Sequence, residues 1–161
     1  MTTPTPAVLR VRPLPSTLGA AALTAGQDGT GNPVPVSHDR AGAQLRCCLR
    51  DARPGEGVVL ITVVPDGPRG AFAERGPVFV HAHDCGGPAD DGYPAGWLTY
   101  RQVVRAYDAD GAITGGEVVE PGGPHEDVIA RWLTDPDVAF VHTRNVVFGC
   151  YLMMFERRAG G

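Results

Sequence analysis

The stretch that decides the fold is Val138-Ala139-Phe140-Val141-His142-Thr143, which a short turn joins to Cys150-Tyr151-Leu152-Met153-Met154-Phe155. Each half is a nearly continuous apolar run, and runs of this length are typical of buried strands. The short turn brings the second run back beside the first, so the two should pair in antiparallel fashion. This part of the chain therefore predicts a β-hairpin in the interior of a sheet.

Outward from this hairpin, strand patterns outnumber helical ones. Apolar residues at helical spacing predict a helix over Pro124–Leu133, and a shorter helix over Leu18–Ala25 is ended by Gly26. Other strands are expected over 7–14, 57–64, 77–83, 97–107 and 112–120, and residues 45–50 form a short apolar-polar stretch that leads to a turn. Because strands do not alternate strictly with helices, we predict an α+β fold with a mainly antiparallel sheet of about seven strands and about two helices.

A chain of 161 residues is long enough for one domain with a sizeable core. We expect a single domain over residues 7–157, with flexible tails at 1–6 and 158–161. Val58–Val64 is expected to be a central strand, because its β-branched residues suit burial on both faces. On that hypothesis Leu60→Ala should cost about 2–5 kcal/mol.

The composition argues against several classes of protein. The net charge is −4, so no basic surface favours nucleic acid. No apolar run approaches the ~18 residues of a membrane span, so no membrane partner is expected. Lysine is absent, which excludes Schiff-base and P-loop lysines. No export signal is visible at the start, so we expect a bacterial-type cytoplasmic protein with reduced cysteines.

The last hairpin carries the first candidate site, because His142, Asn145 and Cys150 lie within nine residues. A cysteine near a histidine is the minimal unit for a nucleophilic thiolate, and Asn145 could orient the imidazole as the third catalytic residue. The alternative is a buried structural cysteine beside a histidine that is bonded to backbone.

A second candidate site would bind a small anionic molecule through Arg105, Arg144 and Asp108. Arg105 stands between apolar residues in the middle of a predicted strand, and a buried arginine needs a partner. That partner is either a carboxylate, such as Asp51, or the anionic group of a ligand.

A third candidate is a metal site at His81, His83 and Cys85. Alternate residues of a strand share a face, so these three could offer ligands to zinc or iron and leave a position open. The alternative is a pair of solvated histidines at a strand end. Cys47 and Cys48 would face opposite ways on a strand, so at most one should enter any site. No cofactor is assigned, with zinc as the one alternative.

Several motifs resemble those of a known family. Val104-Arg105-Ala106-Tyr107-Asp108-Ala109-Asp110-Gly111 and Asp135-Pro136-x-Val138-Ala139-x-Val141-His142-x-x-Asn145-x-x-x-Gly149-Cys150-Tyr151 are similar to the signature of the bacterial domain of unknown function twelve hundred and three. The elements over 46–56 and 74–82 resemble its C-R-x-x-L-x-D-A-x-P-G-E and G-P-[IV]-F-V-H-A motifs. The resemblance implies a one-domain cytoplasmic protein and carries no activity.

Two functional classes follow from these observations. The first is a small-molecule-binding protein or small enzyme, with a polar pocket at the last hairpin and Arg105 for an anionic group. The second is a non-catalytic interaction or structural domain, in which the same polar residues only satisfy the fold. A metal-binding protein built on His81, His83 and Cys85 is a further alternative. No motif specifies an enzyme or an oligomeric state.

Overall fold

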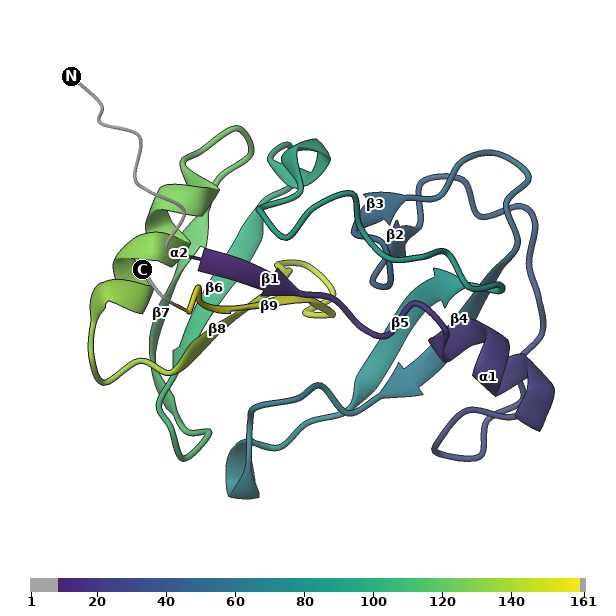
Figure 1. Cartoon of the computed structure of the whole chain (residues 1–161), viewed down its shortest axis with the longest axis horizontal. Helices are drawn as coiled ribbons and strands as arrows, with labels where there is room; N and C mark the ends of the chain where they lie inside the picture. Colours follow the sequence, from purple (N-terminus) through teal and green to yellow (C-terminus); the bar gives the residue numbers. More distant parts are fainter. Residues whose placement is uncertain (1–8, 160–161) are drawn as a thin grey trace. The chain divides into compact units, whose positions relative to one another are not determined.

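The computed structural model describes residues 9–159, so the predicted tail at 1–6 lies outside the described part of the chain. Residues 9–159 contain two α-helices and nine strands, and the strands form two sheets (Figure 1). This arrangement confirms the α+β class. The residues group into two compact units. The five-stranded unit contains residues 9–12, 65–74 and 91–159, and the four-stranded unit contains residues 13–64 and 75–90.

The sheet of the five-stranded unit has the order β1-β9-β8-β6-β7, and every neighbouring pair is antiparallel. Its strands are β1 (Leu9–Arg12), β6 (Gln102–Tyr107), β7 (Ile113–Val119), β8 (Phe140–Asn145) and β9 (Tyr151–Arg157). The hairpin of β8 and β9 therefore lies in the interior of the sheet, as predicted. β8 is buried along nearly all of its length, which agrees with the interior position of the hairpin.

The strand predicted over 97–107 is shorter than expected. Trp97 ends the 3-10 helix η2 (Ala95–Trp97), and β6 begins only at Gln102. The Trp97 carbonyl accepts the Tyr100 N–H at 3.2 Å and the Gln102 side-chain amide at 2.9 Å. These local bonds turn the chain before the sheet begins.

One face of the five-stranded sheet is covered by α2 (His125–Thr134), whose Ile129 and Leu133 are buried (Figure 1). The segment 65–74, which includes the short 3-10 helix η1 (Gly70–Phe72), contacts side chains of β8. Gly67 is required there, because a Cβ at this position would come within 2.4 Å of the Phe140 ring.

The sheet of the four-stranded unit has the order β3-β2-β5-β4. Its strands are β2 (Gln44–Leu45), β3 (Arg50–Asp51), β4 (Val58–Val63) and β5 (Gly76–His81), and only the β2–β5 pair is parallel. Helix α1 (Leu18–Ala25) packs on β4 and β5 (Figure 1). Its boundaries are those predicted, and Gly26 ends it in a left-handed conformation.

The prediction that Val58–Val64 is a central strand is wrong. β4 lies at the edge of its sheet and pairs with β5 alone among the named strands. Leu60 is accordingly 47% exposed, whereas its neighbour Ile61 is 3% exposed. A β-branched run raises strand propensity, but it does not tell an edge strand from a central one.

Side chains and loops partly cover the outer edge of β4. Ser37 forms an isolated bridge with Val58, and the Asp28 carboxylate accepts the Thr62 N–H at 2.9 Å. The hydrogen bonds from Thr62 and Asn32 hold the pKa of Asp28 well below its usual range. The edge therefore has part of its hydrogen-bonding capacity satisfied without a further strand.

Candidate metal centre

Two adjacent cysteines lie in the turn that joins β2 to β3, which covers residues 46–49. The Leu49 N–H donates to the Leu45 carbonyl at 2.8 Å, and Leu49 has a φ of 58°, which is uncommon for a residue other than glycine. Because Cys47 and Cys48 lie in a turn, their side chains do not alternate between two faces as they would in a strand. The expectation that only one of them could enter a site is therefore wrong, because both sulfur atoms face the same imidazole.

That imidazole belongs to His81, the last residue of β5, which is buried. Its Nδ1 atom lies 3.6 Å from Cys47 Sγ and 3.6 Å from Cys48 Sγ. The backbone N–H of His81 also donates to Cys47 Sγ at 3.3 Å. The end of β5 thus directs one ring nitrogen and one backbone amide toward the cysteine turn.

The loop after β5 supplies a third thiol. Asp84 accepts the Gly86 N–H at 3.0 Å, and this bond turns the loop so that Cys85 lies near the other cysteines. One ligand atom from each of Cys47, Cys48, His81 and Cys85 lies within 4.8 Å of all the others. We call this group the Cys3His centre. Cys47 and His81 are almost completely buried and Cys85 is half-buried.

A carboxylate holds the other side of the His81 ring. Glu56 Oε2 lies 2.7 Å from His81 Nε2, and the two Glu56 oxygens accept from Arg50 at 2.7 and 2.8 Å. The Arg50 hydrogen bonds are the main reason that the pKa of Glu56 is far below its usual range. An ionised carboxylate can only accept, so Nε2 carries a hydrogen, and Nδ1 is the ring nitrogen that faces the cysteines. Metal-binding histidines are typically oriented in this way.

The two turn cysteines have opposite electrostatic character. The hydrogen bond from Cys47 lowers the pKa of the Cys48 thiol, and the nearby His81 and Arg50 act in the same direction. The same bond, together with burial, raises the pKa of the Cys47 thiol. Cys48 is therefore the thiol of this pair that ionises first.

The structure brings together two of the three residues that the strand pattern suggested as metal ligands. His81 and Cys85 belong to the Cys3His centre, whereas His83 is exposed and its ring centroid lies 4.8 Å from that of His81. The alternation fails because β5 ends at His81, before His83 is reached. Cys47 and Cys48 were missed as ligands because the sequence around them resembles a short strand.

The predicted catalytic histidine lies in an apolar environment in the five-stranded unit. His142 is fully buried, its Nε2 lies 2.9 Å from the Asp66 carbonyl, and the Tyr107 and Tyr151 rings lie 5.0 and 4.9 Å away. Burial lowers the pKa of His142 to about 3, so the ring is neutral near pH 7. Opposite it on β9 stands Met154.

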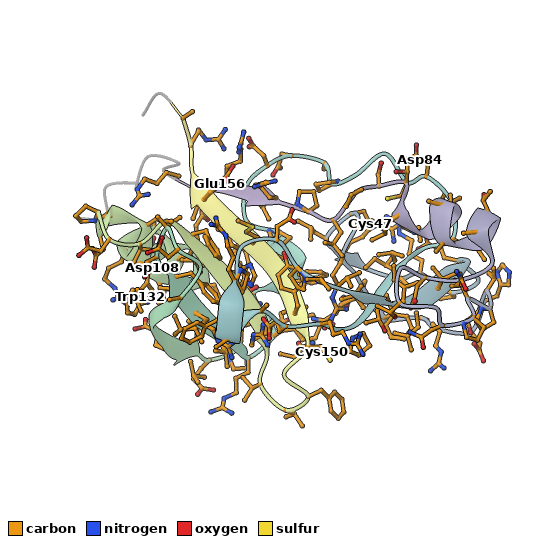
Figure 2. All side chains as sticks on the ribbon, turned by 90° about the horizontal axis from the view of Figure 1, so that it is seen from below. Cys47, Asp84, Asp108, Trp132, Cys150 and Glu156 are labelled. Carbon is orange, nitrogen blue, oxygen red and sulfur yellow. The ribbon has the colours of Figure 1, made fainter. Side chains whose placement is uncertain are left out.

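Cys150 lies at a different register from His142. The Asn145 N–H donates to the Cys150 carbonyl at 2.9 Å, and β9 begins only at Tyr151. Cys150 is therefore part of the turn between β8 and β9 (Figure 2). The hairpin places Cys150 opposite Asn145, so the three predicted catalytic residues do not converge on one point.

The predicted anion-binding residues have contacts within the fold. Arg144 forms an ion pair with Glu74 and donates to the Gly149 carbonyl at 2.9 Å, while Arg105 lies 3.9 Å from the same Glu74 carboxylate. The Asp108 carboxylate accepts two backbone N–H groups of the β6–β7 turn, at 2.9 and 3.0 Å. Glu74 thus supplies a carboxylate partner for both arginines, which is the structural alternative to a bound anion.

Comparison with known proteins shows one similarity, which is to a protein family and covers most of the chain. A family described as "Protein of unknown function (DUF1203)" matches residues 42–157, a range that includes the entire Cys3His centre. No curated protein and no solved structure matches the chain. No helix within residues 9–159 combines the length and the apolar character needed to cross a bilayer. The family match covers most of the chain and confirms the resemblance of its motifs, so this protein belongs to the DUF1203 family.

Proposed function

We propose that this protein binds a thiophilic metal ion, zinc in the first instance, at Cys47, Cys48, Cys85 and His81. The observation that carries the proposal is the convergence of three sulfur donors and one imidazole nitrogen within 4.8 Å. Three cysteines and one histidine are a common ligand set of structural zinc sites, and soft thiolates favour zinc or copper(I) over harder ions.

The distances support a tetrahedral ion. With Zn–S near 2.3 Å and Zn–N near 2.1 Å, a tetrahedral site would separate sulfur and nitrogen by about 3.6 Å. Cys47 Sγ and Cys48 Sγ each lie 3.6 Å from His81 Nδ1. Cys47, Cys48 and His81 therefore show the sulfur–nitrogen spacing of a tetrahedral zinc site.

The surrounding groups also suit a metal-bound histidine. Glu56 fixes the His81 ring through Nε2, and Arg50 fixes Glu56 in turn. A carboxylate in this position raises the basicity of the ligand and keeps Nδ1 free for the ion. The backbone N–H that donates to Cys47 Sγ would stabilise a thiolate there.

Four protein ligands leave no open position, so the proposed ion has a structural role. It would join the β2–β3 turn to the end of β5 and the loop after it, within a unit whose β2 and β3 contain two residues each. Small units with short strands commonly need such a cross-link to supplement their hydrophobic core.

Zinc content tests the proposal. Protein purified without chelator should contain about one zinc per chain, as expected for a single closed site, and His81→Ala and Cys48→Ser should lose it. His83→Ala and Cys150→Ser are matched controls that should keep full zinc content. Cobalt(II) substitution gives a second readout, because thiolate ligation produces a charge-transfer band. Protein that is metal-free and takes up no zinc, or a loss of zinc in His83→Ala, would contradict the proposal.

A thiol nucleophile is the second candidate function. Cys48, His81 and Glu56 stand in the order of nucleophile, base and orienting carboxylate, with a 3.6 Å step from sulfur to nitrogen and a 2.7 Å step from nitrogen to oxygen. If Cys48 is a nucleophile, the purified protein should be metal-free. Iodoacetamide should then alkylate Cys48 faster than Cys150 under native conditions. Zinc-bound protein in which Cys48 is protected from alkylation favours the metal centre instead.

A further inference from the structure

We infer that the Cys3His centre is sensitive to oxidation, and that a peroxide converts Cys47 and Cys85 to a disulfide and releases the metal. The inference rests on the proposed function, since it concerns regulation of the same site. It depends on the arrangement and the unequal exposure of the three thiols.

The three sulfur atoms differ in their access to solvent. Cys47 is 1% exposed and Cys48 is 8% exposed, both in the tight β2–β3 turn, whereas Cys85 is half-buried on a loop. The residues after Cys85 are Gly86 and Gly87, both with positive φ. A small oxidant would therefore reach Cys85 first, because this thiol is the least buried of the three.

Cys85 also has a partner in position. The Cys85 and Cys47 sulfur atoms lie within 4.8 Å of each other, and the Cys85 side chain is a hydrogen-bond partner of the Cys47 thiol. A disulfide between Cys47 and Cys48 would instead join adjacent residues within a single turn, a geometry that strains the bond. The pair that bridges the turn and the loop is the better candidate for oxidation.

The chemistry balances with hydrogen peroxide as the oxidant. The metal-bound Cys85 thiolate attacks peroxide, the O–O bond breaks, and Cys85 becomes a sulfenic acid while one hydroxide is released. The Cys47 thiolate then attacks the Cys85 sulfur, the S–O bond breaks, and a second hydroxide leaves as the disulfide forms. Two sulfur atoms have each lost one electron to the peroxide oxygens, and a thiol reductant reverses the change.

Loss of these two thiolates would dismantle the metal site. Only Cys48 and His81 would remain as ligands, fewer than the four that a structural zinc ion takes. The disulfide would still connect the β2–β3 turn to the loop after β5, so the four-stranded unit would keep a cross-link without its ion.

The test treats zinc-loaded protein with hydrogen peroxide, follows zinc release with a chromogenic chelator, and maps disulfides by mass spectrometry of non-reduced peptides. Wild type should release its zinc with the appearance of a Cys47–Cys85 disulfide, and dithiothreitol should restore zinc binding. Cys150→Ser is the control and should behave as wild type. Cys85→Ser should form no disulfide at Cys47, whether or not it holds zinc.

The outcomes separate this inference from the proposed function. If zinc is bound but peroxide yields no Cys47–Cys85 disulfide, or yields a Cys47–Cys48 disulfide, the inference fails and the metal centre stands. If the protein never binds zinc but still forms the Cys47–Cys85 disulfide, the metal centre fails and the pair is a thiol switch by itself. Release of zinc with only sulfinic acid at Cys85 would also overturn the inference.

Discussion

The five-stranded and four-stranded units each bury a histidine on a strand, but the surroundings of the two side chains are opposite. His142 lies among the rings of Tyr107, Phe140 and Tyr151, and a backbone carbonyl is its hydrogen-bond partner. His81 lies between sulfur atoms on one side and a carboxylate on the other. Burial in the first environment disfavours the protonated form of the ring, whereas the second supplies ligands and the groups that orient them.

This difference shows what identifies a site in this protein. The candidate residues of the β8–β9 hairpin lie closer together in sequence than those of the Cys3His centre, yet their polar groups contact separate partners. The residues of the Cys3His centre are spread over 47–85 and converge in space. Convergence of donor atoms, and not density along the chain, is therefore the better guide to chemistry here.

The largest combined effect on stability and zinc binding is expected from Gly19→Ala in the four-stranded unit. A Cβ at Gly19 would lie 1.8 Å from the carbonyl oxygen of His81, so α1 could no longer pack directly on the end of β5. We expect destabilisation near the upper end of about 1–3 kcal/mol, because backbone atoms cannot rotate away, together with weaker zinc binding. Chemical denaturation and zinc titration would measure both.

The matched control is Gly29→Ala. A Cβ at Gly29 meets nothing within 4 Å, and this variant should be close to wild type in both measurements. If Gly19→Ala leaves stability and zinc affinity unchanged, α1 does not support the His81 backbone as the structure indicates.

The buried histidine of the five-stranded unit should make stability fall in acid. The pKa of His142 is about 3 in the folded protein, below the 6.5 of an unperturbed histidine, so protons bind preferentially to the unfolded chain. The contribution of the neutral His142 ring to the free energy of unfolding is complete above pH 6.5 and is lost as the pH falls toward 3. Between pH 7.5 and pH 5 the loss should be about 2 kcal/mol.

His142→Gln isolates this effect, because the amide of glutamine can replace the Nε2–H donor to Asp66 without titrating. Chemical denaturation of wild type and variant at several pH values gives the difference between their free energies of unfolding. The effects of the other titrating groups cancel in this difference. A wild-type protein that loses no more stability than His142→Gln over this range would show that His142 is not a buried neutral ring.

The smallest effect is expected from Leu60→Ala, at about 0.5 kcal/mol or less, as is usual for surface substitutions. Leu60 lies on the edge strand and is 47% exposed. Ile61→Ala on the same strand is the control, and at 3% exposure it should cost about 2–5 kcal/mol. Equal losses in the two variants would mean that β4 is buried on both faces after all.

Much of the fold could be predicted from the sequence because the main elements are local patterns. The β8–β9 hairpin, helix α1 and the β6–β7 hairpin follow from apolar periodicity and turn residues. The edge position of β4 depends on which strands pair, and no local pattern in Val58–Val63 encodes that choice. The same limit explains why Leu60 was expected in the core.

The candidate site was predicted in part for a related reason. His81 and Cys85 are close in sequence, so their proximity could be inferred from a strand pattern. Cys47 and Cys48 join them only through the parallel pairing of β2 with β5 and through the left-handed Leu49. Neither the long-range pairing nor a positive φ at a leucine has a signature in a single sequence.

Zinc K-edge X-ray absorption of the zinc-loaded protein tests the central claim most directly, because it reads the ligands of the ion itself. We predict a first shell of three sulfur atoms at about 2.3 Å and one nitrogen at about 2.0–2.1 Å. A first shell of oxygen and nitrogen alone, as adventitious surface binding gives, would contradict the assignment of the Cys3His centre as a metal site.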